Sequence, residues 1–322
     1  MKSFSEYSGL IEKGIQDLKF PGEELGNLYN PISYALGAGG KRLRPSLLMM
    51  AADAYGNKCE SAISAALGIE MFHNFTLLHD DVMDKSDTRR GRPTVHAKWD
   101  ENRAILSGDT MLTLATQLVG KVEDRILREV LDTFNSTAIR VYEGQQLDMD
   151  FENREDVTIE EYIRMIEDKT GALIAAAVKI GAMIGGATVR EAERIYEYGM
   201  KLGVAFQIQD DWLDVFGDST TFGKPVGGDI NNNKKTFLML SGLCAGGPDS
   251  EALKEALQLP AGPTKVRTVT RIYEKMRISE ISKKEIARYS SLALVALKDS
   301  GLDEVRREPF RALVDKLTGR DR

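Results

Sequence analysis

The sequence of 322 residues is poor in the side chains that build disulfide frameworks and transition-metal centres. It has two cysteines, Cys59 and Cys244, which lie far apart with no paired spacing, and three histidines. A disulfide scaffold or a zinc site therefore has little support, and we expect a protein of the reducing cytoplasm. An excess of positive charge is also missing, because the net charge is −6 at pH 7. A nucleic-acid partner, which requires a basic face, is not expected.

Long apolar runs are lacking as well. The most apolar stretch, residues 172–189, is interrupted by Lys179 and is rich in Ala and Gly, so it falls short of a membrane span. The first 20 residues carry charges where a signal peptide would need an apolar core. We therefore predict no integral membrane segment and an ordinary amphipathic helix at the N-terminus.

Alternation of apolar and polar residues, the pattern of a half-buried strand, is also missing, whereas helical periodicity is extensive. No stretch of Pro, Ser or charge is long enough for an interdomain linker, so we predict a single all-α domain over residues 1–322. The predicted helices cover residues 3–18, 31–55, 60–83, 100–119, 124–150, 159–185, 190–216, 234–245, 250–258, 263–275 and 280–298.

One short acidic pattern occurs twice, as DDVMD at residues 80–84 and as DDWLD at residues 210–214. At about 3.6 residues per turn, the first and last Asp of each pattern lie roughly 40° apart on one helix face. Carboxylates so close together destabilise a helix unless a cation compensates them. Oxygen ligands without His or Cys select Mg²⁺ or its relatives, so we predict Mg²⁺ with Mn²⁺ as a substitute.

Two other readings of these residues stay open at this point. An acidic triplet is often a solvated helix face, although the repetition of the pattern inside two apolar helices argues against it. A di-iron carboxylate bundle would use Glu-x-x-His steps, of which Glu70 and His73 form one. That site requires two such steps, and neither His79 nor His96 has a Glu three positions earlier.

Cationic residues suited to phosphate follow glycines or the acidic patterns. Each alone would be a solvated surface charge, but together they are enough for two polyphosphate groups. They are Lys41 and Arg44 in GGKRLRP, Arg89 and Arg90 in TRRG, Lys169 beside Thr170 in DKTGAL, and Lys224, Lys234 and Lys235 with Asp229 in GKPVGGDINNNKK.

With these residues in place, the chain resembles the trans-prenyltransferases, or polyprenyl diphosphate synthases. Five motifs carry the resemblance over nearly the whole chain: GGKRLRP, HNFTLLHDDVMDKSDTRRG, DKTGAL, FQIQDDWLD and GKPVGGDI. The resemblance implies the isoprenoid synthase type of fold, a large helical bundle around a central cavity, with the acidic motifs facing each other across its mouth, usually in a homodimer. It implies a Mg²⁺-dependent head-to-tail (1'-4) condensation of isopentenyl diphosphate with a C5 to C15 allylic diphosphate.

The resemblance also implies a role for each matching residue. Asp80 and Asp84 would hold two Mg²⁺ and Asp210 a third, with Asp81, Asp211, Asp214 and Asp229 in support. The allylic diphosphate would contact Arg89, Lys169 and Lys224, helped by Gln207 and Thr170. Isopentenyl diphosphate would contact Lys41, Arg44, His73 and Arg90, and Lys234 would lie near a closing loop.

Product length is expected to depend on Phe75, five positions and roughly 7.5 Å of helix before Asp80. In the resembling family an aromatic side chain here limits the product, and a second aromatic at the next position limits it further. The next residue is the smaller Thr76, which indicates a short-chain product, C20 first and C15 next. Met71 and Phe72, about one turn deeper, should also exclude a long product such as C40.

Two alternatives of another class remain. A non-catalytic partner subunit of a prenyl synthase would be expected to have lost an acidic motif, and both are intact. A class I terpene cyclase or a head-to-head condensing enzyme also ionises allylic diphosphates with Mg²⁺. It has no need for the residues that the resemblance assigns to isopentenyl diphosphate, whose presence counts against it.

Overall fold

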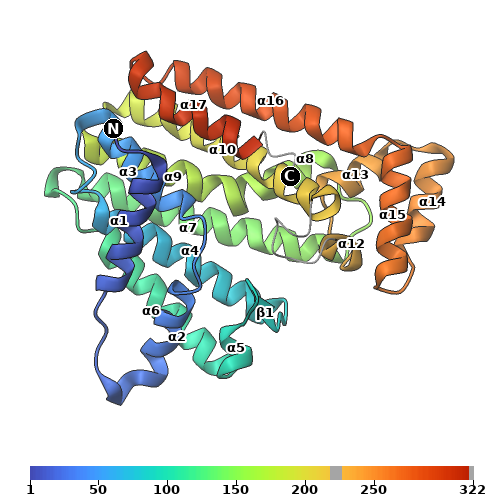
Figure 1. Cartoon of the computed structure of the whole chain (residues 1–322), viewed down its shortest axis with the longest axis horizontal. Helices are drawn as coiled ribbons and strands as arrows, with labels where there is room; N and C mark the ends of the chain where they lie inside the picture. The colour runs from blue at the N-terminus through green and yellow to red at the C-terminus, as the bar shows by residue number, and fades with distance from the viewer. Residues whose placement is uncertain (218–226, 319–322) are drawn as a thin grey trace. The chain divides into compact units, whose positions relative to one another are not determined.

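The computed structural model describes residues 1–217 and 227–318 (Figure 1). Within these ranges the regular structure is helical apart from one short antiparallel hairpin, which confirms the predicted all-α class. The same helices are each too short or too polar to cross a membrane. The contacts divide the chain into two compact units, and the prediction of a single domain over residues 1–322 stays a prediction.

The first unit comprises residues 1–136, 176–196 and 299–309. Its main elements are α1 (Phe4–Asp17), η1 (Glu23–Leu25), α2 (Gly26–Leu36), α3 (Leu43–Gly56), α4 (Ile63–Met83), β1 (Thr88–Arg89), β2 (Arg92–Pro93), α5 (Val95–Lys98) and α6 (Glu101–Val119). Parts of α7 (Asp124–Glu152), α9 (Ala172–Gly185), α10 (Val189–Phe216) and α17 (Glu304–Thr318) also belong to it.

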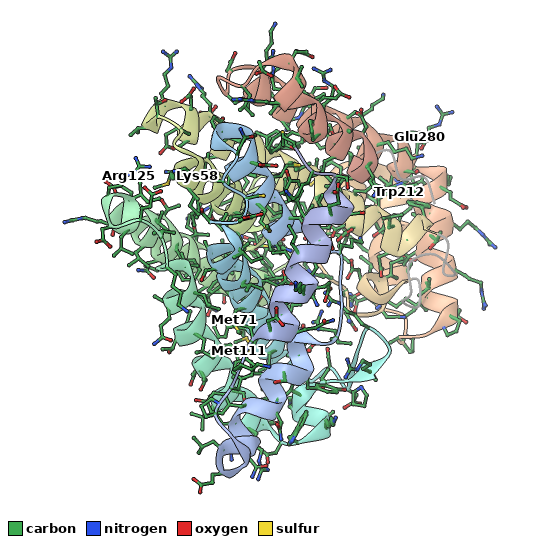
Figure 2. All side chains as sticks on the ribbon, turned by 60° about the vertical axis from the view of Figure 1, so that its left-hand side comes forward. Lys58, Met71, Met111, Arg125, Trp212 and Glu280 are labelled. Atoms are coloured by element: carbon green, nitrogen blue, oxygen red, sulfur yellow. The ribbon has the colours of Figure 1, made fainter. Side chains whose placement is uncertain are left out.

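Helix α4 is the central element of the first unit. It packs along α6 and also contacts α1, α2, α3 and α5. Apolar side chains occupy almost its whole circumference, which is the composition of a helix surrounded by other helices. The side chains of Met71 of α4 and Met111 of α6 are both buried in this core (Figure 2). The C-terminal end of α4, which carries the first acidic motif, leads into the hairpin (Figure 1).

The second unit comprises residues 137–175, 197–298 and 310–322, as far as they are described. Besides its parts of α7, α9, α10 and α17, it contains α8 (Ile159–Ile166), the π-helical segment η2 (Glu167–Gly171), α12 (Gly228–Asn231), α13 (Phe237–Cys244), α14 (Gly247–Leu257), α15 (Pro263–Lys275) and α16 (Ile278–Lys298). Its core is built by side chains of α8, α10, α13, α15 and α16 around Tyr162, Val204, Leu238 and Tyr273.

The predicted helix 31–55 is wrong, because the structure has two helices there. The chain leaves the helical conformation between α2 and α3, where Gly39, Gly40 and Arg42 have φ values of 75°, 141° and 46°. Glycine adopts such values without a steric penalty, which is the local reason for the break. The helix predicted at 159–185 contains the π-helical segment, and the hairpin and α17 were not predicted.

Candidate active site

The first acidic motif lies at the C-terminal end of α4. Asp80 belongs to the last turn, and Asp84 caps the helix with its backbone N–H donating to the Asp80 carbonyl at 2.8 Å. Asp80 is half-buried and Asp84 is exposed. The end of a helix carries partial negative charge from its carbonyls, so a cation is favoured there in addition to the carboxylates.

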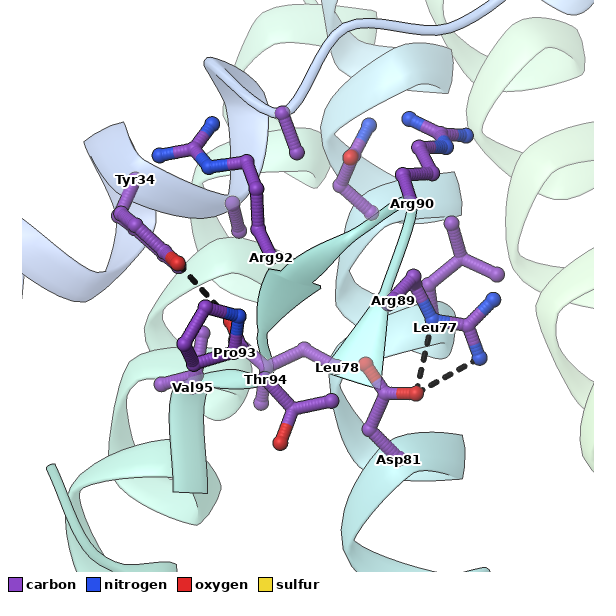
Figure 3. Close-up of a pocket in the computed structure, with 13 residues that line it drawn as sticks. Tyr34, Leu77, Leu78, Asp81, Arg89, Arg90, Arg92, Pro93, Thr94 and Val95 are labelled. Carbon is purple, nitrogen blue, oxygen red and sulfur yellow. Dashed lines mark hydrogen bonds and ion pairs between the residues drawn. The ribbon is translucent and has the colours of Figure 1, made fainter. Parts of the chain in front are cut away.

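Asp81, the middle residue of this acidic group, forms an ion pair with Arg89. Its Oδ1 accepts from both Nε and Nη2 of Arg89, each at 2.7 Å (Figure 3). Burial raises the pKa of the Asp81 carboxyl above its ordinary value, and the Arg89 guanidinium opposes that shift. The pair fixes Arg89 beside the motif. The predicted supporting role of Asp81 in metal binding stays a prediction.

Arg89 and Arg90 are presented by a tight hairpin. Strands β1 and β2 pair antiparallel, with Thr88 opposite Pro93 and Arg89 opposite Arg92. The two turn residues, Arg90 and Gly91, have φ values of 52° and 71°, the combination that a two-residue hairpin turn requires. Strands of two residues are too short to show alternation, so no strand pattern can be recognised here beyond the RG dipeptide of the turn.

Two of the residues assigned to isopentenyl diphosphate, Arg44 and Arg90, lie near a third, His73 of α4. Arg44 Nη1 lies 3.3 Å from His73 Nε2. Burial, followed by the nearby Arg44, Arg90, Arg89 and Arg42, lowers the pKa of His73 well below its ordinary value. Because a guanidinium only donates, the neutral imidazole accepts at Nε2 and carries its proton at Nδ1. Lys41 is exposed and lies two residues before the start of α3 at Leu43.

In the second unit, Asp148 of α7 holds two of the predicted phosphate-binding lysines. Its Oδ2 lies 2.6 Å from Lys169 Nζ and 3.7 Å from Lys234 Nζ. Burial favours the protonated carboxyl, but the ammonium groups of Lys234 and Lys169 outweigh it and hold the pKa of Asp148 below its ordinary value. Sequence reasoning missed Asp148, whose motif GQQLDMD shows no spacing that distinguishes it from a solvated helix face.

The π-helical segment that carries Lys169 and Thr170 lies close to α7. At Gly144 a Cβ atom would come within 2.3 Å of the Lys169 backbone nitrogen, so only glycine permits this approach. The glycine therefore places the backbone of Lys169 against the helix that supplies Asp148. A wide turn here agrees with the frequent occurrence of π turns at functional sites.

A chain of hydrogen bonds joins Thr170 to the second acidic motif. Thr170 Oγ1 donates to Gln207 Oε1 at 2.9 Å, and Gln207 Nε2 donates to Asp211 Oδ1 at 3.0 Å. Tyr162 donates its hydroxyl to Asp211 Oδ2 at 2.5 Å. Burial, reinforced by the negative charge of Asp229, raises the pKa of Asp211 to about 7. Asp211 is thus a buried anchor of the network.

Asp210 and Asp214 lie in the last turns of α10, and both are half-buried. Asp214 accepts two hydrogen bonds from the segment that begins at residue 227. Its Oδ2 accepts from the Asp229 backbone N–H at 3.0 Å, and its carbonyl accepts from the Gly227 N–H at 2.7 Å. Lys224, predicted to contact the allylic diphosphate, lies outside the described residues.

The chemistry of the donors fits Mg²⁺. In residues 1–217 and 227–318, no three His, Cys, Asp or Glu side chains are arranged to hold an ion by themselves. Mg²⁺ usually binds one or two carboxylates and completes its shell with water and substrate phosphate, which suits Asp80 with Asp84 and the single Asp210. Glu70, by contrast, accepts from Arg42 Nη1 at 2.6 Å and from Asn74 Nδ2 at 3.0 Å, which weakens the di-iron alternative.

The residues expected to set product length belong to an aromatic stack. The ring of Phe75, only 6% exposed, lies 5.5 Å from that of Phe72 and 4.8 Å from that of His79. Phe72 in turn packs edge-on against Phe134 of α7 at 5.3 Å. Thr76 is half-buried and donates its hydroxyl to the His73 carbonyl at 2.8 Å. Phe75 is therefore backed by a second pair of aromatic rings.

Comparison with known proteins agrees with this reading of the motifs. Residues 26–276 match the polyprenyl synthetase family, and the chain belongs to that family. Geranylgeranyl diphosphate synthase of Methanosarcina mazei is 46% identical over 216 residues, 66% of this chain and 67% of that protein. A crystal structure of a geranylgeranyl pyrophosphate synthase superposes with a TM-score of 0.95 at 40% identity, covering 99% of each chain.

A third relative was solved with ligands. The polyprenyl synthase of Caulobacter crescentus CB15, in complex with calcium and isoprenyl diphosphate, is 27% identical with a TM-score of 0.85, covering 99% of this chain and 94% of its own. These likenesses confirm the predicted isoprenoid synthase type of fold. The predicted facing of the two acidic motifs across a cavity mouth stays a prediction.

Proposed function

We propose that the chain is a trans-prenyltransferase that condenses isopentenyl diphosphate head-to-tail with an allylic diphosphate of C5 to C15. The observation that carries the proposal is the pair of acidic motifs at helix ends, the first paired with Arg89 and the second joined through Gln207 to Thr170, the neighbour of Lys169. The names of the curated relatives, among them the geranylgeranyl diphosphate synthase of Methanosarcina mazei, support it.

In this reaction the allylic C–O bond breaks and pyrophosphate leaves. The double bond of isopentenyl diphosphate attacks the allylic carbon, and the proton lost from the adduct goes to pyrophosphate. Asp80, Asp84 and Asp210 would hold three Mg²⁺, which when bound stabilise the charge that builds on the departing diphosphate. Arg89, Lys169, Lys224 and Lys234 add positive charge, with Thr170 and Gln207 as hydrogen-bonding partners.

The second substrate needs a site that binds its diphosphate without ionising it. Lys41, Arg44 and Arg90 supply the charge for this site, and neutral His73 orients Arg44 by accepting its hydrogen bond. Holding both substrates in line removes most of the entropic barrier to their reaction. Phe75 would close the space under the growing tail, so that a short-chain all-trans product, C20 first and C15 next, is released.

The same proposal includes a homodimer in the cytoplasm. The exposed apolar side chains of Ile105 and Leu106 on α6, 44% and 59% accessible, support a partner surface on that helix. A C2 dimer is the commonest assembly of soluble chains.

The decisive experiment supplies the purified chain with isopentenyl diphosphate, Mg²⁺ and each of the C5, C10 and C15 allylic diphosphates, followed by mass spectrometry of the products. A C20 or C15 prenyl diphosphate that disappears with EDTA supports the proposal. A chain that elongates none of the three primers would instead point to a non-catalytic partner subunit, and a cyclic or head-to-head product to the other alternative.

A further inference from the structure

The hairpin contacts two parts of the first unit that carry different predicted substrate residues. Through Arg89 it is bound to Asp81 in the first acidic motif. Through Arg90 and Arg92 it is bound to the segment of residues 37–42, called here the α2–α3 loop, which contains Lys41. The hairpin is therefore a physical link between the acidic motif and the loop.

Arg92 makes the outer contact with the loop. Its Nη1 donates to the Gly37 carbonyl at 3.0 Å, and its guanidinium carbon lies 4.2 Å from the centre of the Tyr34 ring. Tyr34 of α2 donates its hydroxyl to the Pro93 carbonyl of β2 at 2.9 Å, so each side of this contact donates a hydrogen bond to the other (Figure 3). A charged donor and a ring face together hold the beginning of the loop against β2.

The middle of the loop is shaped around Arg90. The guanidinium of Arg90 donates to the Gly39 carbonyl. A Cβ atom on Gly40 would come within 2.8 Å of Arg90 Nη1, so any larger residue there would have to displace the Arg90 guanidinium. Gly40 of the GGKRLRP motif thus leaves room for Arg90 of the hairpin, and Gly39 and Gly40 both have positive φ values.

The end of the loop is fixed from the opposite side. Arg42, 3% exposed, donates to Glu12 of α1 at 2.7 Å, to Glu70 of α4 at 2.6 Å and to the Leu36 carbonyl at 2.8 Å. Two carboxylates and a carbonyl satisfy the buried guanidinium. Lys41 therefore projects as an exposed residue from a loop that is held at its beginning, middle and end.

We infer that Arg92 and Tyr34 are positioning residues for isopentenyl diphosphate, because they fix the α2–α3 loop, which contains Lys41 and leads into Arg44, the neighbour of His73. The inference rests on the proposed function. Neither side chain needs to touch the substrate. Their effect is to order the loop before the substrate binds. The entropic cost of ordering the loop then does not weaken the binding of the diphosphate.

The test compares Arg92→Gln with Lys98→Gln in steady-state assays of both substrates. Lys98 Nζ also lies over the Tyr34 ring, at 4.0 Å, but its second contact is with the Trp99 ring, at 4.6 Å, rather than with the α2–α3 loop. The Lys98 variant therefore removes a positive charge from the same Tyr34 ring. We expect Arg92→Gln to raise the KM for isopentenyl diphosphate roughly tenfold, the effect of losing one charged hydrogen bond. The KM for the allylic diphosphate and kcat should stay within about twofold of the wild type.

Tyr34→Phe serves as the second variant, because it keeps the ring and removes only the hydroxyl. It should raise the KM for isopentenyl diphosphate less than Arg92→Gln does, and Arg92→Lys should recover part of the lost affinity. Equal effects of Arg92→Gln and Lys98→Gln, or a parallel rise of both Michaelis constants, would overturn the inference. A wild type that elongates no primer would overturn the proposed function instead, which keeps the two failures distinct.

Discussion

His73 combines a half-buried side chain with four nearby guanidinium groups, and this has a consequence for stability. Its folded pKa lies well below the ordinary value of about 6.5, so the unfolded chain binds a proton below that pH which the folded chain does not bind. The free energy of unfolding should therefore fall as the pH drops below about 6.5, by up to about 1.4 kcal/mol per pH unit from this group. Urea unfolding between pH 7.5 and 5 measures the slope. His73→Gln should flatten it, and an unchanged slope contradicts the assignment.

Asp148 holds Lys169, which is predicted to contact the allylic diphosphate, and Lys234, which is predicted to lie near a closing loop. We expect Asp148→Asn to lower kcat/KM for the allylic substrate at least tenfold, because an amide keeps the shape but no longer holds Lys169 and Lys234 in place. The KM for isopentenyl diphosphate should not change.

The matched control for Asp148 is Asp150→Asn on the same helix. Asp150 is exposed and accepts from Gln146, one turn earlier. In steady-state kinetics, the two variants should differ in kcat/KM for the allylic substrate and agree in KM for isopentenyl diphosphate. If both variants lose the same activity, the effect belongs to the charge of α7 rather than to the position of the lysines.

At the scale of the elements, α4 carries both the first acidic motif and the aromatic stack below it. We expect Phe75→Ala to lengthen the product by one or a few C5 units, because Phe72 and Phe134 remain as the next obstacle. Phe134→Ala alone should leave the product unchanged, since Phe75 still closes the space. Mass spectrometry of the products decides, and an unchanged distribution in active, folded Phe75→Ala would place the limit elsewhere.

The helices that can be predicted from the sequence are those with long, regular apolar periodicity. Helix α4 was predicted at residues 60–83 and observed at Ile63–Met83, because its apolar pattern continues through the single Gly68 and meets no proline. The predicted helix 31–55 failed at Gly39, Gly40 and Arg42, where backbone conformation overrides periodicity. Helix α17 was missed because Pro309 lies inside it, and a proline usually marks the end of a helix.

Much of the candidate site was visible in the residue types, but not the pairing of its charges. The sequence predicts Asp80, Asp84, Arg89 and Lys169 as a group because acidic and basic residues cluster in short motifs. It does not show that Asp81 holds Arg89 or that Asp148 holds Lys169, because these contacts depend on turns of the hairpin and of the π-helical segment. Such partners are specified by tertiary packing rather than by spacing.

At the scale of the whole molecule, metal and diphosphate are expected to bind as one ligand. Among residues 1–217 and 227–318 no three His, Cys, Asp or Glu side chains are arranged to hold an ion, whereas the carboxylates can share an ion with phosphate oxygens. We expect Mg²⁺ with inorganic pyrophosphate to stabilise the protein by about 2.7 kcal/mol at a hundredfold excess over the dissociation constant.

Thermal unfolding with each component alone and with both together measures this coupling. Mg²⁺ alone or pyrophosphate alone should shift Tm much less than the mixture does, and EDTA should abolish the shift. A full shift with Mg²⁺ alone would show that the protein holds the ion by itself.

The π-helical segment Glu167–Gly171 also bears on how this protein is compared with its relatives. In its i to i+5 pattern the Ala172 N–H donates to the Glu167 carbonyl, which accommodates one residue more than an α-helix of the same rise. Such a turn is equivalent to a one-residue insertion, and each residue contributes about 100° of rotation. A relative that aligns with a one-residue gap within these five residues therefore differs from this chain in the direction in which its lysine points, and not merely in its length.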